Sequence, residues 1–406
     1  MVKKFSNPAL LYAYTGCTSL IFMLPVIIPF YNHQLGLTFQ DFLFAEAFFA
    51  CVVIAMEVPS GYMSDRWSRK FTLSVASLFG MIGYTAIIMA DGLVGVMIAQ
   101  GILGVAVACN SGTISALMYD SLLENGNLKT YQKQEGRRHG IGLYCVGIGS
   151  ICGGFLYALN PYAPFYVDIA TLALAMGISI LIKEPVRHRA SAEIHPLKDI
   201  WDTAKYCLHG HKLLAATILT GVIIFGATKQ MMWAQQPFFM LNAIDEKYFG
   251  MLMAIGFVAG GLSGQFGHMI TARLSSFQVL GLMVLAMFAA CWISALNIPY
   301  LSLAVLFTGA VIFGAGFPYF SELISSEVEQ KRRATALSAM GFLISIAFIP
   351  LSLFIGAADE YFDIRYALAG LGLWVLCGGS LGLLVWKKYY NRGNNAIRGR
   401  AQQVHR

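Results

Sequence analysis

Residues 57–70 read EVPSGYMSDRWSRK and change within a few positions from an apolar run to a cluster of charges. The apolar run before this cluster covers about residues 41–62, and another one starts near residue 71. A helix rises about 1.5 Å per residue, so roughly twenty apolar residues can cross a hydrocarbon layer of about 30 Å. The charged segment therefore connects two predicted membrane spans.

The whole chain has the composition of a membrane protein. Apolar residues make up 57% and charged residues 12% of its 406 residues, whereas about a quarter of a soluble domain is charged. Long apolar segments recur along the sequence, and they predict an all-α polytopic membrane protein with twelve spans. The expected spans are 9–31, 41–62, 71–90, 93–119, 139–158, 164–182, 213–240, 248–271, 278–296, 300–321, 334–356 and 366–386.

The longest interruption of the apolar pattern runs from Lys183 to Lys212. It divides the twelve spans into two groups of six. We therefore predict an N-terminal six-helix bundle in residues 1–182, a cytoplasmic central loop in 183–212, a C-terminal six-helix bundle in 213–390 and a basic cytoplasmic tail in 391–406.

The positions of the basic residues predict the orientation. If the N-terminus is cytoplasmic, 25 of the 28 Lys and Arg residues lie in cytoplasmic segments, and the exceptions are Lys229, Lys247 and Arg365. Basic residues favour the cytoplasmic side, so we expect both termini there. The net charge of +7 then faces an anionic lipid surface. The lipid bilayer is thus an expected partner, and nucleic acid is not.

Signatures of enzymatic and metal chemistry are missing from the sequence. There is no P-loop and no H-E-x-x-H spacing. Seven of the eight cysteines lie in predicted spans, and no two form a C-x-x-C pair. We therefore predict no enzymatic activity, no cofactor and no metal site. The missing P-loop also argues against ATP as an energy source.

The two halves of the chain repeat each other weakly, as in many transporters. A shift of about 203 residues lays GYMSDRWSRK (61–70) over GQFGHMITAR (264–273), which is a degenerate copy. Pro29 and Pro237 occupy similar places, and we expect them to end the first and seventh spans.

These features together resemble the major facilitator superfamily. Its motif between spans 2 and 3 is G-x-L-A-D-R-x-G-R-K. This chain keeps the glycine, the Asp-Arg pair and the final Arg-Lys of that motif in GYMSDRWSRK, but has Met63, Ser64 and Ser68 at its other fixed positions. The resemblance covers essentially the whole chain. It implies two six-helix bundles that alternate about a central site lined by spans 1, 4, 7 and 10.

Three further segments are similar to a bacterial branch of that superfamily: EVPSG (57–61), SGTISALMYDSL (111–122) and RRATALS (332–338). The branch contains proposed drug exporters and carriers of unassigned substrate. For this chain, the resemblance implies a bacterial inner membrane and a monomeric carrier. Two antiporter signatures are altered here. Met97 stands where the span 4 signature has Arg, and Ser150 replaces the proline of G-P-x-x-G-G in GSICGG.

The resemblance implies a gate at the charged segment. Asp65 would accept hydrogen bonds from the positive N-terminus of span 11, which SEVE (326–329) would cap. A glycine at position 61 would let two helices approach closely. The alternative is that the basic residues only fix topology. The predicted gating residues are Gly61, Asp65, Arg66, Arg69, Lys70 and Arg333.

Lys229 is the outstanding candidate for substrate binding, because an ionisable group deep in a span is costly to keep there. Trp233 and Gln236 follow it on the same helical face, and Gln230 is adjacent. A cation, an amide and an aromatic plane suit an anionic or chelate-like organic ligand. Asn110 belongs to a polar span 4 that suits a cavity wall. Alternatively, Lys229 reaches outward to the headgroups or pairs with an acid.

The candidates for proton coupling are Asp120, Glu57 and Glu46, all in or near predicted spans. A partly buried carboxylate can bind the coupling proton. The alternative is a structural ion pair with Arg137, Arg138, Arg332 or Arg333.

Two hypotheses for transport remain. The first is proton-coupled efflux of an amphipathic small molecule such as a drug, a metabolite or a siderophore, with anions as one class. The second is proton-driven import of a nutrient or an iron-siderophore chelate, which Lys229 and the altered antiporter signatures favour. A receptor or scaffold without transport is disfavoured by the retained charged motif.

Overall fold

A computed structural model describes residues 6–185, 211–328 and 333–404 of the chain. These residues form helices and short connections, with no β-strand among them. Twelve helical segments are long and apolar enough to cross a membrane. They coincide with the twelve predicted spans, with ends that differ by a few residues. The prediction of an all-α polytopic membrane protein is confirmed.

The chain forms two compact units. Unit 1 comprises Met1–Glu193 and Gln236–Phe257, and unit 2 comprises Ile194–Gln235 and Val258–Arg406. The chain therefore passes from one unit to the other inside two helices, close to Gln236 and again close to Phe257. The predicted central loop lies mostly outside the described residues, so the predicted domain boundaries stay a prediction.

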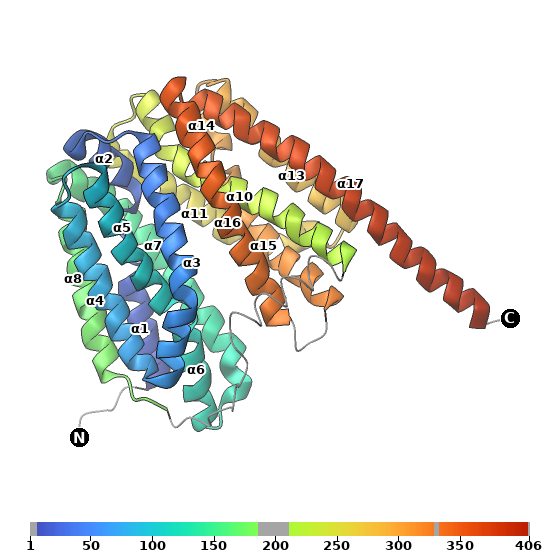
Figure 1. The fold of residues 1–406 in the computed structure, drawn as a ribbon, viewed down its shortest axis with the longest axis horizontal. Helices are drawn as coiled ribbons and strands as arrows, with labels where there is room; N and C mark the ends of the chain where they lie inside the picture. Colours follow the sequence, from blue (N-terminus) through green and yellow to red (C-terminus); the bar gives the residue numbers. More distant parts are fainter. Residues whose placement is uncertain (1–5, 186–210, 329–332, 405–406) are drawn as a thin grey trace. The chain divides into compact units, whose positions relative to one another are not determined.

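Unit 1 is a bundle of membrane-spanning helices (Figure 1). Within it α4 packs against α5 and α8, α5 also packs against α3, and α1 lies against α7 and α8. Its elements are α1 (Asn7–Ser19), η1 (Leu24–Val26), α2 (Ile27–Leu35), α3 (Phe39–Arg66), α4 (Arg69–Ile88), α5 (Gly92–Asn110), α6 (Thr113–Glu124), η2 (Leu128–Thr130), α7 (Tyr131–Leu159), α8 (Ala163–Leu181) and η4 (Glu246–Tyr248).

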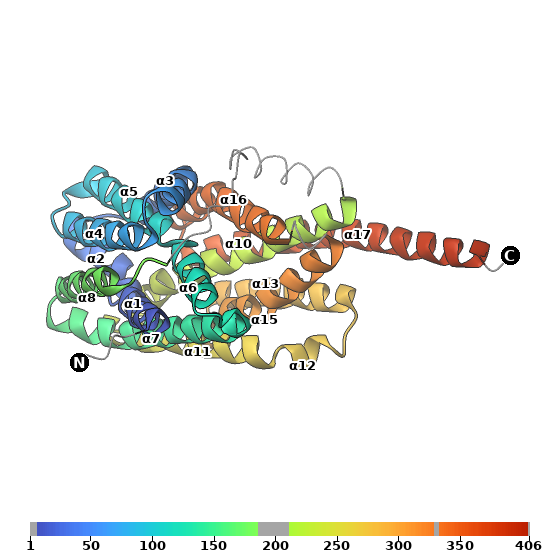
Figure 2. The same ribbon diagram turned by 90° about the horizontal axis from the view of Figure 1, so that it is seen from below.

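Unit 2 has the second set of helices, in which α17 packs against α13 and α16, and α15 against α13 and α16. The helix α17 continues as one element towards the C-terminus (Figures 1 and 2). The elements are α12 (His268–Thr271), α13 (Ser276–Ala295), α14 (Leu301–Val305), α15 (Thr308–Glu327), α16 (Arg333–Tyr361) and α17 (Ile364–Val404), and both units share α10 (Lys212–Leu241) and α11 (Phe249–Phe266).

Local capping explains where several helices begin. The Thr38 side chain accepts from the Asp41 amide, and the Asp41 carboxylate accepts from the Thr38 amide, a reciprocal capping box that starts α3. Ser275 and Gln278 form the same arrangement at the start of α13. Ser326, the first residue of SEVE, lies inside α15 and donates to the Leu323 carbonyl at 2.8 Å, so it does not cap α16 as predicted. Glu329 lies outside the described residues.

Two predicted spans are interrupted. Span 4 divides into α5 and α6 at Gly112, whose φ of 70° is a left-handed conformation that glycine adopts without strain. Span 1 divides after Ser19 and resumes as a helix only at Leu24. The prediction that prolines end spans 1 and 7 was wrong. Pro29 lies in the first turn of α2, where no intrahelical N–H bond is lost, and α10 continues four residues past Pro237 to Leu241.

Candidate functional site

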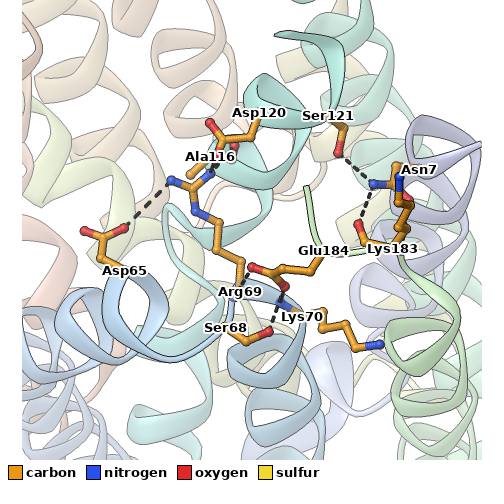
Figure 3. A network of polar contacts seen from close by, with 10 residues as sticks. All are labelled: Asn7, Asp65, Ser68, Arg69, Lys70, Ala116, Asp120, Ser121, Lys183 and Glu184. Carbon is orange, nitrogen blue, oxygen red and sulfur yellow. Dashed lines mark hydrogen bonds and ion pairs between the residues drawn. The ribbon is translucent and has the colours of Figure 1, made fainter. Parts of the chain in front are cut away.

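The charged segment of unit 1 is organised around Arg69 (Figure 3). Its guanidinium donates to the Asp120 carboxylate and, at 2.7 Å, to the Ala116 carbonyl, both in α6. The side chains of Arg69 and Asp120 are 14% and 21% exposed, so their ion pair is largely shielded from solvent. Asp65 lies 3.8 Å from the same guanidinium but is itself exposed. Arg69 therefore connects the end of α3, the start of α4 and α6.

Glu184 caps the N-terminus of α4 from a distant part of the chain (Figure 3). Its two carboxylate oxygens accept from the Arg69 and Lys70 amides, each at 3.0 Å, and from the Ser68 hydroxyl at 2.7 Å. A carboxylate at a helix N-terminus interacts favourably with the helix dipole and with the amides that lack helical partners. The residues that follow α8 are thereby fixed to the charged segment.

Asn7 makes a second connection at this end of unit 1 (Figure 3). Its amide donates to the Ser121 hydroxyl at 2.9 Å and to the Lys183 carbonyl at 2.7 Å, and its oxygen accepts from the Lys183 amide at 3.1 Å. The Lys183 ammonium lies 3.2 Å from Glu124. Polar contacts thus join α1, α6 and the segment after α8.

Of the other predicted gating residues, Gly61, Arg66 and Lys70 belong to unit 1 and Arg333 belongs to unit 2. Lys70 donates from its ammonium to the Ile180 carbonyl at 3.2 Å. Arg66 lies over the Tyr62 ring, 5.8 Å from its centroid. A Cβ added at Gly61 would meet no atom within 4 Å, so no helix of unit 1 approaches this glycine closely, and the expected approach to span 11 of unit 2 stays a prediction. Arg333 is the first residue of α16, and its side chain lies outside the described ones.

Asp120 has a different partner from those predicted. It pairs with Arg69 rather than with Arg137 or Arg138, because α6 places its carboxylate against the start of α4. Arg138 instead pairs with Glu135, one helical turn earlier in α7. Arg137 lies over the Tyr12 ring. Arg332 lies outside the described residues.

The candidate substrate residues in unit 2 surround Lys229, just past the middle of the 30-residue α10. The Lys229 side chain is partly buried, and its ammonium lies 3.7 Å from the centre of the Phe348 ring in α16. A cation over an aromatic face is attracted by the negative potential of the ring. The structure thus places a positive charge in the interior of a membrane-spanning helix.

Gln230 and Trp233 are more buried than Lys229. The Gln230 amide donates to the Ser352 hydroxyl at 2.6 Å, and its Oε1 is buried without a hydrogen-bond partner among the described residues. Trp233 is buried as well. In this conformation Gln230 connects α10 to α16 through Ser352.

Gln236 belongs to unit 1 and is fully buried. Its Oε1 accepts from the Ile28 amide at 3.1 Å, and its Nε2 donates to the Leu24 carbonyl at 2.9 Å. In a regular helix those two backbone groups would bond to each other. The side-chain amide therefore inserts at the start of α2, and its hydrogen bonds here are made within unit 1, whereas Lys229 belongs to unit 2.

Asn110, Glu46 and Glu57 have three different environments. Asn110 ends α5 at the break in span 4, and its Oδ1 is buried without a hydrogen-bond partner among the described residues. Glu46 is buried in α3, where it accepts from the Gln100 amide at 3.1 Å. Glu57 is exposed on the same helix. The described part of the chain contains no cluster of three His, Cys, Asp or Glu side chains arranged to hold a metal ion.

Sequence reasoning missed Asn7, Glu184 and Phe348 as site residues. Glu184 and Asn7 are far from the charged segment in sequence, and no local pattern relates them to it. Glu184 had one available signal, an acidic residue directly after a predicted span in a basic loop. Phe348 is one of 28 phenylalanines in an apolar chain, so sequence alone does not single it out.

Twelve spans, two compact units, a polar network at one end of unit 1 and a lysine inside a span of unit 2 define a membrane transporter of the secondary class. The model of the Major Facilitator Superfamily matches residues 2–144 and 133–352, and the chain belongs to this family. An uncharacterised MFS-type transporter of Bacillus subtilis strain 168, YxaM, is 25% identical over 218 residues, which is 50% of this chain and 51% of that protein. The match thus spans about half the length of that relative.

Solved structures of transporters share the fold at low sequence identity. A point mutant of the nucleoside transporter NupG has a TM-score of 0.79 at 14% identity, and the match covers 94% of this chain and all of that one. A D-xylose-proton symporter has a TM-score of 0.71 at 15% identity over 94% and 96% of the two chains. A bacterial homologue of the lysosomal transporter Spinster has a TM-score of 0.70 at 14% identity over 95% and 96%. At this identity the likeness concerns the fold alone.

Proposed function

We propose that the protein moves a small organic anion across the bacterial inner membrane by proton-coupled alternating access. The observation that carries the proposal is the Lys229 ammonium inside a membrane span. A charge at this depth in a membrane is unfavourable and indicates a functional role. In a carrier, the expected role is to bind the transported molecule. Phe348 beside it offers an apolar plane, so an amphipathic anion with an aromatic or aliphatic body fits best.

Gln230 and Asn110 support the same proposal. Each has a buried side-chain oxygen without a hydrogen-bond partner among the described residues. A buried polar atom left unpaired costs about 1–3 kcal/mol, so such atoms tend to have a partner in some state of the protein. A ligand with hydroxyl or amide donors would supply one. Trp233 and Gln236 stay in the proposed substrate set as residues whose side chains would have to rearrange.

The charged segment is the proposed gate on the cytoplasmic side. Its contacts are polar, and Asp65 is exposed at its edge, 3.8 Å from Arg69. Exposed ionic contacts contribute at most about 1 kcal/mol, so they can break and re-form during a transport cycle. We expect Asp65→Asn to slow or trap the cycle while ligand affinity changes only a few-fold. Wild-type turnover in this variant would remove Asp65 from the gate.

Among the proposed proton sites, Glu46 fits best. It is buried and accepts from a neutral amide, an arrangement that tolerates a neutral carboxyl group. Asp120 is already paired with the Arg69 guanidinium, so we propose a structural role for it first. Glu57 is exposed, so a proton bound to it would have less effect on the contacts between helices.

Export is the first proposed direction. The altered antiporter segment GSICGG retains tight glycine packing. A Cβ at Gly153 would overlap the Phe22 carbonyl oxygen, and one at Gly154 would lie 2.6 Å from the Lys247 carbonyl oxygen. Import of a nutrient or iron chelate is the second candidate, favoured by Lys229 and by Met97 in place of the antiporter arginine.

The test uses the purified protein in liposomes that contain a pH-sensitive dye, with an imposed proton gradient. The panel comprises aromatic carboxylates, hydroxamate and catecholate iron chelates, and the lipophilic cation tetraphenylphosphonium. Transport of an anion with proton movement is expected in the wild type, and it should be lost in Lys229→Ala. Lys247→Ala is the matched control, because Lys247 is paired with Asp245 in a connection near the end of a span.

The outcomes separate the hypotheses. Unchanged anion transport in Lys229→Ala would contradict the substrate site, provided that the variant inserts normally. Comparison of right-side-out with inverted membrane vesicles decides between import and export. Binding of panel compounds, seen as thermal stabilisation, without transport of any of them would favour a receptor over a carrier.

A further inference from the structure

The interruption of span 1 lies against a buried carboxylate. In the gap between α1 and η1, the Phe22 amide donates to Asp168 Oδ1 at 2.8 Å and the Met23 amide donates to Oδ2 at 3.0 Å. Asp168 comes from α8, and only 1% of it is exposed. Both oxygens of one carboxylate therefore fix the broken turn.

Backbone packing holds the same gap from another side. A Cβ at Gly149 of α7 would lie 2.9 Å from the Ile21 nitrogen, and one at Gly153 would overlap the Phe22 carbonyl oxygen. On the far side of the gap, Gln236 bonds to the Leu24 carbonyl. The conformation of this segment is thus imposed by α7, α8 and the end of α10, and not by its own helical hydrogen bonds.

The phenol of Tyr84 is a titratable group near Asp168. Tyr84 in α4 lies within electrostatic range of Asp168 and of Tyr31 in α2. Tyr31 is fully buried, its hydroxyl has no hydrogen-bond partner among the described residues, and Glu46 is within electrostatic range of it. Within the described residues, the Asp168 carboxylate accepts from the Phe22 and Met23 amides and forms no ion pair with a Lys, Arg or His side chain. Its hydrogen bonds therefore come from backbone amides.

The charge state of such a group decides what it can bond. An ionised carboxylate is acceptor-only and serves both amides, whereas a protonated one has become a donor at one oxygen. A buried carboxylate that lacks a cationic partner binds a proton more readily than an exposed one. A proton would therefore weaken at least one of the two amide bonds, and a buried amide without a partner is unfavourable.

We propose that Asp168 is a proton-binding site, and that its charge state decides whether the gap in span 1 is held or released. The ionised form holds the Phe22 and Met23 amides, and the protonated form lets the segment rearrange. This inference rests on the proposed proton-coupled transport and adds a carboxylate other than Glu46, Glu57 and Asp120. Span 1 is one of the helices expected to line the central site. Proton binding at Asp168 and substrate binding at the central site would therefore both affect the conformation of span 1.

Hydrogen–deuterium exchange of the full-length protein in lipid nanodiscs tests this without a known cargo. Exchange of peptides that cover residues 20–26 is measured between about pH 5 and about pH 9, after correction for the intrinsic pH dependence of exchange. We expect protection to fall about ten-fold as pH decreases, since the loss of about 1.4 kcal/mol corresponds to that factor. In Asp168→Asn, exchange should be fast at every pH.

Asp41→Asn is the matched control. Asp41 also accepts from a backbone amide, that of Thr38, but it lies at the start of α3. This variant should leave residues 20–26 protected and pH-dependent. Wild-type protection that is independent of pH overturns the proposal, and so does an Asp168→Asn variant that exchanges like the wild type. If Asp168→Asn does not fold, the wild-type pH series still decides. Failure here leaves the Lys229 transport test untouched, so the two proposals can fail separately.

Discussion

The two copies of the helix 2–3 segment are held in opposite ways. In unit 1, residues 61–70 are fixed by side chains, chiefly the Arg69–Asp120 pair and the Glu184 cap, while Gly61 faces open space. In unit 2, residues 264–273 lack the acidic residue, and a Cβ at Gly264 would lie 3.2 Å from the Gly314 carbonyl oxygen. One copy uses polar contacts that can exchange partners, and the other uses close backbone packing that cannot.

This difference has a physical consequence for a carrier. The contact of Arg69 with the exposed Asp65 can break at low cost and re-form in another state, whereas close-packed backbones lose contacts abruptly when they separate. We therefore expect the charged copy to take part in the conformational cycle and the glycine copy to keep α11 and α15 together throughout it. Four predictions test this comparison, in decreasing order of expected effect.

The largest effect is expected at the glycine contact of unit 2. A Cβ at Gly314 would overlap the Gly260 carbonyl oxygen, so Gly314→Ala forces two helices apart. Overpacking typically lowers the free energy of unfolding by about 1–3 kcal/mol, and we expect about 3 kcal/mol or more here. The apparent melting temperature in detergent should fall by several degrees. Gly61→Ala is the control and should melt like the wild type; equal losses in both variants would end the proposed contrast.

The second effect concerns the ion pair of unit 1. Arg69→Ala leaves Asp120 without its guanidinium in a mostly buried setting, and the expected loss lies between those of surface and buried pairs, about 1–3 kcal/mol. Arg273→Ala, in the degenerate and exposed copy, should have almost no effect. A double-mutant cycle with Asp120→Ala measures the coupling through thermal stability. Additive effects would mean that the pair contributes nothing specific.

The third effect separates two ways of capping a helix. Glu184→Gln keeps the shape of the α4 cap but removes its charge, and Ser275→Ala removes the neutral cap of α13. Loss of a cap costs about 0.5–2 kcal/mol. As the salt concentration is raised, the difference in hydrogen exchange between variant and wild type should shrink only for Glu184→Gln, because salt screens the charge of Glu184 in the wild type. Hydrogen exchange in the first turn of each helix reports this, and identical salt responses would contradict the charged-cap interpretation.

The smallest effect is expected at Asp363, between spans 11 and 12. A hydrogen bond from Arg365 lowers the pKa of Asp363 below its ordinary value. Its contribution to stability is therefore present above the ordinary pKa of about 4 and is lost as the pH falls through the lowered folded-state value. Because Arg365 is 45% exposed, that contribution is below about 1 kcal/mol. Arg365→Ala should shift acid-dependent melting only slightly, and a loss as large as that of Arg69→Ala would contradict the ranking.

Much of the fold could be predicted because bilayer thickness fixes the length of each apolar segment. The interruptions of spans 1 and 4 could not be predicted in this way. The gap after Ser19 depends on Asp168 and Gln236, which are more than a hundred residues away in sequence. The apolar pattern around Leu20 continues through the gap, so hydropathy shows a single span where the structure has two helices.

The candidate site was predictable only in part. Lys229 stands out because a charge in an apolar run is visible in sequence, and Asp65 and Arg69 stand out through their motif. The residues that contact them could not be predicted from the sequence. For Asp120 the alternative to proton binding was an ion pair with Arg137, Arg138, Arg332 or Arg333, but α6 begins after the turn at Gly112 and brings Asp120 to Arg69.

The sequence by itself determined the class of the protein, its twelve spans and the family to which it belongs, because these follow from composition, segment length and a local motif. Only the tertiary structure decided which groups meet: Glu184 at the α4 N-terminus, Phe348 beside Lys229, and Asp168 at the broken turn of span 1. The physical reason is that hydrophobic burial is non-directional and is visible residue by residue, whereas hydrogen bonds and ion pairs depend on geometry that helix packing alone creates.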